Sequence, residues 1–180
     1  MSKRFSRGLS FSVTVVAMLF VGPATASWAQ YGERYVAFRA VGPGGLGIEG
    51  KGSDVSLREQ GDAIVATVGL GSLSTGIELR DKHMREKYLE TAKYPVLVFT
   101  IDKSKVKSPF EGDIDGNLKL HGVTQSVRLH YKATGTEKHA SVVGSTKLNM
   151  KDFNIAVPSY LGVSVKPDVT VTFKLDVEDR

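Results

Sequence analysis

The sequence predicts a mainly β fold, with about eight antiparallel strands and one helix between two of them. Apolar and polar residues alternate over several short segments, which is the pattern of strands that bury one face. Many of the 19 glycines punctuate these segments, as turns in an antiparallel β protein require. A closed barrel and a β-sandwich both produce this alternation, although only the barrel removes free edge strands.

The first 29 residues have the pattern of a cleaved export signal. Three basic residues fall within the first seven positions, an apolar run follows over 9–22, and small polar residues come next. The run is short for a bilayer span, which takes about 20 residues, and hydroxyl side chains dilute it. We therefore expect cleavage after Ala29, or after Ala26. The domain over 30–180 would then be periplasmic or secreted, with no stable membrane insertion.

Charge and cysteine content exclude several classes of function. The predicted leader holds three of the 24 basic residues and none of the 19 acidic ones, so the remaining chain has 21 against 19, a net charge of +2. It has no basic stripe of the kind that binds nucleic acid. The chain has no cysteine, which rules out disulfides, thiol nucleophiles and thiolate metal sites. The predicted domain must therefore rely on its own apolar core, for which about 150 residues suffice.

Six of the predicted strands can be located in the sequence, and each has one apolar face. The period of two is clearest near the C-terminus, where apolar residues at odd positions from 169 to 177 alternate with polar ones. A tight turn near Gly122 would join two further strands into a hairpin. The predicted inward residues are Val36, Phe38 and Ala40; Ile64, Ala66, Val68 and Leu70; Leu97, Phe99 and Ile101; Leu118, Leu120, Val127, Leu129 and Tyr131; and Val169, Val171, Phe173, Leu175 and Val177.

One helix is predicted before the strand at 96–101. Thr75 followed by Glu78 fits a capping box, which satisfies backbone N–H groups at a helix start. Pro95 cannot continue the helix and biases the residue before it towards extended geometry. A thin apolar stripe on this helix consists of Ile77, Met84 and Tyr88.

The charged run 80–85 on this helix has two interpretations. As a solvated surface, it is supported by acid-to-base pairs four residues apart, Glu78 with Lys82 and Asp81 with Arg85. As part of a site, its basic side chains would contact a polar or phosphate head group through charge-assisted hydrogen bonds. The candidates for that contact are Arg80, His83 and Arg85.

Three motifs resemble a known family. The stretch TGIELRDKHMREKYLETAKYPVLVF (75–99) resembles the signature of the YceI-like family, which consists of exported, lipocalin-like proteins described as polyisoprenoid- or lipid-binding. GNLKLHGVTQSVRL (116–129) resembles the second hairpin of that family, and KLNMKDFNI (147–155) resembles its closing segment. The resemblance extends over 36–177. It implies a closed antiparallel lipocalin-like barrel rather than a sandwich.

The resemblance also implies non-covalent binding of a polyisoprenoid or other long-chain lipid inside the barrel, for storage or transfer. An eight-stranded barrel is wide enough to be filled by its own side chains or to hold one slender ligand. A solid core is therefore the alternative interpretation of each inward residue. The predicted lipid contacts are Phe38, Val68, Leu97, Phe99, Leu118, Leu120, Leu129 and Phe173.

A second hypothesis belongs to a different class of function: a solid-cored stress-response or interaction module that meets a protein partner and binds no lipid. A tunnel through the barrel would distinguish the two. We expect no enzymatic activity, since the sequence has no nucleophile elbow, P-loop or paired-carboxylate motif. The four histidines have no two-ligand spacing, so we expect no metal and no cofactor. The sequence leaves a homodimer open.

Overall fold

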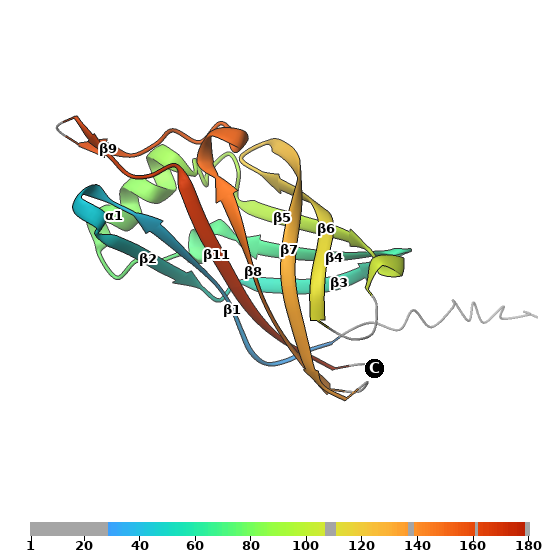
Figure 1. The fold of residues 1–180 in the computed structure, drawn as a ribbon. Coiled ribbons are helices and arrows are strands. Elements are labelled where there is room, and N and C mark those ends of the chain that lie inside the picture. The colour runs from blue at the N-terminus through green and yellow to red at the C-terminus, as the bar shows by residue number, and fades with distance from the viewer. Residues whose placement is uncertain (1–28, 107–110, 137–138, 161, 179–180) are drawn as a thin grey trace, which may run out of the picture.

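The computed structural model describes residues 29–106, 111–136, 139–160 and 162–178, so the predicted leader up to residue 28 lies outside the described residues. Within these ranges, nine strands form one curled antiparallel sheet in the order β2-β1-β11-β8-β7-β6-β5-β4-β3 (Figure 1). The mainly β antiparallel fold is thus confirmed. The strands are β1 (Ala29–Val41), β2 (Gly47–Gly52), β3 (Val55–Gln60), β4 (Ala63–Gly69), β5 (Val96–Asp102), β6 (Glu111–Leu120), β7 (Val123–Gly135), β8 (His139–Asn149) and β11 (Asp168–Glu178).

The sheet is curled by one bent strand. Only Ser53 and Asp54 separate β2 from β3, yet β2 pairs with β1 at one edge of the sheet and β3 pairs with β4 at the other. The two edge strands are therefore joined covalently at one corner. If β2 and β3 are counted as the halves of one strand, the wall has eight strands, which matches the number expected from the sequence.

A seam runs along the wall where β3 faces the first half of β1. Among the described residues no backbone pairing joins these two segments. Apolar side chains meet behind the seam instead, since Val55 of β3 packs in one cluster with Leu175 and Val177 of β11, and Val36 of β1 packs against this cluster. Next to the bend, Lys51 of β2 and Ser74 exchange two backbone hydrogen bonds of 2.9 Å. This bridge attaches the segment before the helix to β2.

Three phenylalanines lie flat against the wall because glycines face them on neighbouring strands. Phe38 is the direct partner of Gly50, and Phe173 is the direct partner of Gly144. A side chain at either glycine would overlap the phenylalanine ring, and the same holds for Gly116 beneath Phe99. The sequence suggested that the glycines over 42–52 mark turns. Gly50 lies within β2 instead, where its missing side chain makes room for a ring.

The helix forms, but its start differs from the prediction. α1 (Glu78–His83) continues into a wider turn of π type, η3 (Met84–Tyr88). Its N-cap residue is Ile77, and no side chain caps it, so the capping box predicted from Thr75 is wrong. Met84 and Tyr88 pack against the main apolar cluster, whereas Ile77 is exposed. The apolar stripe thus holds in its second half only.

Two of the other described connections are single tight turns. At the β6–β7 turn, His121 and Gly122 both have positive φ, which is the primed turn geometry expected near Gly122. The bend expected around Phe153 is a single turn, η5 (Met150–Phe153), and Asn154 follows it in left-handed geometry. β9 (Ser159–Tyr160) and β10 (Val163–Ser164) form a small separate hairpin. No helix in the described ranges is long and apolar enough to cross a bilayer.

Candidate functional site

The barrel is hollow and contains two adjoining cavities. The first, which we call the mouth chamber, has a volume of about 610 Å³ and lies at the end of the barrel that carries α1. The second, the far chamber, has a volume of about 500 Å³ and extends towards the β7–β8 turn. Both volumes fall in the range of small-molecule sites. The residues that line both chambers are Val36, Val68, Leu97, Leu148 and Val171.

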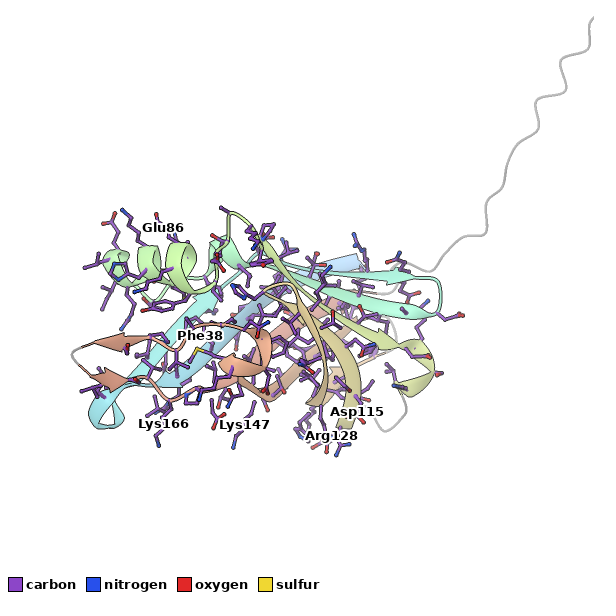
Figure 2. All side chains as sticks on the ribbon, turned by 90° about the horizontal axis from the view of Figure 1, so that it is seen from above. Phe38, Glu86, Asp115, Arg128, Lys147 and Lys166 are labelled. Carbon is purple, nitrogen blue, oxygen red and sulfur yellow. The ribbon has the colours of Figure 1, made fainter. Side chains whose placement is uncertain are left out.

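All eight residues proposed from the sequence as lipid contacts line one chamber or both. They come from β1, β4, β5, β6, β7 and β11, and each points inward on the apolar face of its strand. Figure 2 shows Phe38 inside the barrel, whereas Glu86, Lys147 and Lys166 project from its outside. Phe38 and Leu120 line the mouth chamber; Phe99, Leu118, Leu129 and Phe173 line the far chamber; and Val68 and Leu97 line both.

The mouth chamber opens to solvent between three elements. These are α1 with η3, the β1–β2 hairpin with its short turn η1 (Pro43–Gly45), and the β9–β10 hairpin, which all lie at one end of the barrel (Figure 1). Ile77, Leu79 and Val163 belong to the lining of the chamber, yet they are 53%, 65% and 50% exposed. A chamber lined by exposed side chains reaches the surface, so a ligand has access from this end.

The described lining of the mouth chamber has three basic side chains and no acidic one. They are Arg80, His83 and Lys87, which lie three and four residues apart and therefore share one helix face. Among the described residues, the lining of the far chamber includes no charged side chain. The site thus combines a long apolar bore with basic groups at its opening. This arrangement suits a molecule with a long apolar chain and one polar or anionic end.

The structure separates the three basic residues that the sequence suggested for a head group. Arg80 and His83 line the mouth chamber, but Arg85 lines neither chamber. Its Nη2 lies 3.5 Å from the carbonyl oxygen of Leu73 and 3.8 Å from Asp81 Oδ2. The sequence interpretation missed Lys87, although its spacing from His83 places it on the face that already held two of the candidates.

Asp81 is a structural anchor rather than part of a solvated surface. Its residue is only 5% exposed, and its carboxylate accepts hydrogen bonds from Ser74 Oγ (2.6 Å), Thr75 N (2.7 Å) and Thr75 Oγ1 (2.5 Å). The predicted ion pair with Arg85 is present at 3.8 Å, whereas Glu78 and Lys82 form no such pair in the described chain. Because Ser74 also bridges to β2, Asp81 fixes the helix to the wall beside the mouth.

The pKa of Asp81 reflects the same contacts. Burial, the largest single effect, raises the pKa of this carboxyl group. The hydrogen bonds from Ser74 and Thr75, together with the positive charge of Arg85, outweigh burial and hold the pKa below its ordinary value. The carboxylate therefore stabilises the segment in its ionised form.

A second polar contact fixes the end of η3 beside the mouth chamber. His121 Nε2 lies 2.7 Å from Glu90 Oε2, and His121 Nδ1 lies 3.1 Å from the carbonyl oxygen of Phe153. The imidazole ring also packs on Tyr94, with 4.5 Å between ring centroids. The histidine thus connects the segment after the helix with η5. Within the described ranges, no three metal-ligating side chains cluster around it or elsewhere.

Comparison with known proteins identifies similar chains. A family model described as the YceI-like domain matches residues 10–177. Proteins named "Protein YceI" from Salmonella arizonae and Salmonella newport are 39% identical to this chain over 101 residues, which is 52% of this chain and 52% of each relative. The match thus spans about half the length of these curated relatives.

Solved structures share the fold at low sequence identity. A polyisoprenoid binding domain from Saccharophagus degradans matches with a TM-score of 0.69 and 18% identity, covering 87% of this chain and 100% of that one. Burkholderia cenocepacia BcnA matches with a TM-score of 0.64 and 14% identity, over 79% and 95% of the two chains. The Campylobacter jejuni YceI protein matches with a TM-score of 0.52 and 15% identity, over 99% of both.

Proposed function

This chain belongs to the YceI-like domain family, and on that premise we propose that it binds a polyisoprenoid or another long-chain lipid non-covalently inside its barrel. The observation that carries the proposal is the pair of adjoining apolar chambers, about 610 and 500 Å³ in volume. The similar domain from Saccharophagus degradans is described as polyisoprenoid binding, which supports the same ligand class here.

The physical basis of binding is the burial of an apolar chain. Removing several hundred Å² of chain surface from water at about 25 cal/mol per Å² gives on the order of 10 kcal/mol before the cost of association. A chain that runs from the mouth chamber into the far chamber would contact Val68 and Leu97, which line both. This energy is non-directional, so the interior needs few polar groups.

The polar end of the ligand belongs at the mouth. Arg80, His83 and Lys87 are the basic lining residues there, and a phosphate or carboxylate would accept their hydrogen bonds. Arg80 is already oriented by Thr75, since its Nε lies 2.8 Å from Thr75 Oγ1 and its Nη2 lies 3.1 Å from the Thr75 carbonyl oxygen. An anionic head group is the form that this all-basic lining favours.

We further propose that the protein stores or transfers this lipid in the periplasm and catalyses no reaction. The leader pattern over 1–29 supports export. Exclusion of water from a long chain is useful in an aqueous compartment between membranes. The alternative of a solid-cored interaction module loses its premise, because the interior is hollow.

Native mass spectrometry of the protein purified from its export compartment tests the proposal. We expect a stoichiometric mass increase, and organic extraction should release a long-chain lipid. An unshifted mass, both as purified and after incubation with polyprenyl and acyl lipids, would overturn it.

The head-group assignment has a separate test. Lys87→Gln should weaken binding of a polyprenyl phosphate by about tenfold, because one charge-assisted hydrogen bond is lost, and should leave the neutral polyprenol unaffected. Lys82→Gln is the matched control, since Lys82 is exposed on the same helix but lines neither chamber. Equal losses for the phosphate and the alcohol would refute an ionic contact at the mouth.

A further inference from the structure

Exposed apolar side chains gather around the opening of the barrel. Of the six large apolar residues that are exposed in the described chain, four lie on the three elements that surround the mouth chamber. We call these four the apolar rim. They are Leu46 (64% exposed), Ile77 (53%), Leu79 (65%) and Val163 (50%).

The apolar rim is continuous with the interior. Ile77, Leu79 and Val163 line the mouth chamber as well as the surface, so apolar surface runs from inside the barrel to its outside. Leu46 follows Pro43–Gly45 at the tip of the β1–β2 hairpin and lines neither chamber. The side chain of Leu46 is therefore largely left in solvent by the fold. Clustered apolar side chains of this kind mark a surface that is covered by a partner.

The charges near the rim indicate the chemistry of that partner. In the described chain, the lining of the mouth has basic side chains and no acidic one. Lys166 adds a further basic group, which projects beside the β9–β10 hairpin (Figure 2). Glu86, by contrast, projects from the side of the helix away from Phe38 (Figure 2). Apolar tips accompanied by basic side chains suit the interface of a bilayer that contains anionic lipid.

We propose that the apolar rim docks the mouth of the barrel against an anionic lipid bilayer. Docking places the mouth chamber next to the acyl region, so a lipid chain passes between membrane and barrel without crossing water. That path avoids a penalty of about fourfold in equilibrium constant for every methylene exposed. The identity of the passenger rests on the proposed function, but docking itself requires only the rim and the basic side chains.

Sedimentation with vesicles tests the docking. The wild-type protein should bind vesicles of phosphatidylcholine mixed with phosphatidylglycerol, and more weakly vesicles of phosphatidylcholine alone or in high salt. Leu46→Glu and Leu79→Glu should each lower the affinity for the mixed vesicles by about tenfold, since each removes a leucine that is about two-thirds exposed and adds a negative charge. Val143→Glu is the matched control, because Val143 is 42% exposed on β8, away from the mouth.

Three outcomes would overturn the docking. The first is a wild-type protein that sediments with neither vesicle, and the second is a Val143→Glu variant that loses as much affinity as Leu46→Glu. The third is a change in oligomeric state on Leu46→Glu in analytical ultracentrifugation, which would make the rim a contact between two copies. Lipid content separates this inference from the proposed function. A protein that carries lipid but does not bind vesicles refutes docking alone. A protein that binds vesicles but holds no lipid, both as purified and after incubation with lipid, refutes the lipid carrier alone.

Discussion

Replacing Gly116 by alanine should narrow the far chamber without changing the wall. Gly116 is buried on β6, and a Cβ there would lie 2.5 Å from Phe99 Cζ and 2.6 Å from Ile101 Cγ2. The atoms nearest to this Cβ all belong to the side chains of Phe99 and Ile101. The backbone can therefore stay in place while the Phe99 ring rotates away from the wall. The ring already lines the far chamber, which offers it space.

The expected loss of lipid affinity follows from the space that the ring takes. A ring that enters the bore displaces about three methylene groups of a bound chain at about 0.8 kcal/mol each. The affinity should therefore fall by about 2 kcal/mol, or roughly thirtyfold in Kd. The free energy of unfolding should fall by about 1–2 kcal/mol, because overpacking is partly offset by the removal of a strand glycine.

Displacement of a fluorescent long-chain probe measures the lipid affinity, and urea unfolding measures the stability. Gly47→Ala is the matched control, since a Cβ on this glycine of β2 would meet only the Arg39 guanidinium group, at 3.6 Å or more. Adding Phe99→Leu to Gly116→Ala should restore binding by making room again. A folded Gly116→Ala protein with wild-type Kd would refute the reasoning, because the ligand could not then occupy the far chamber.

Two further predictions concern the segments that hold the mouth together. Asp81→Asn should lower the free energy of unfolding by about 3 kcal/mol, since donors of Ser74 and Thr75 lose a buried anion. The pKa of Asp81 is lower in the folded protein than its ordinary value of 3.8. The ionised carboxylate therefore stabilises the fold fully above pH 3.8, and this stabilisation is lost as the pH falls below that value. The difference in urea stability between wild type and variant should therefore shrink in acid; a constant difference would contradict an ionised anchor. His121→Asn should keep the turn, since asparagine tolerates positive φ, but should destabilise the protein by about 1–2 kcal/mol through loss of the Glu90 contact, measured by the same urea method. Unchanged stability would show that this contact contributes nothing.

The strand faces could be predicted from the sequence because side chains alternate with a period of two on any half-buried strand. Val169 to Val177 shows this, since each odd position faces the interior of the barrel. The choice of a barrel over a sandwich came from the family resemblance, because both architectures produce the same alternation. Whether the barrel is hollow depends on how rings pack, and no pattern along the chain states that Gly144 faces Phe173.

Local motifs failed where tertiary contacts compete with them. Thr75 has the spacing of a capping residue, but its hydroxyl group donates to Asp81, which a solvated-helix interpretation had left on the surface. A local motif cannot anticipate this buried carboxylate, because Ser74, which donates to it, is held in place by its backbone hydrogen bonds to Lys51 of β2. Lys87, by contrast, could have been found, because it continues the helix face of His83.

The unpaired seam leaves the barrel wall without backbone pairing along one line between β3 and β1 in the described chain. Among the described residues no backbone hydrogen bond joins β3 to β1, so we expect the wall to widen there by sliding the side chain of Val55 past Val177. A barrel of this kind has an adjustable diameter, so a branched or bulky chain would be accommodated by elastic opening rather than by local unfolding. If the barrel holds a lipid as proposed, the seam would limit the width of that lipid, whereas the glycines beneath the phenylalanine rings fix the width of the interior without ligand.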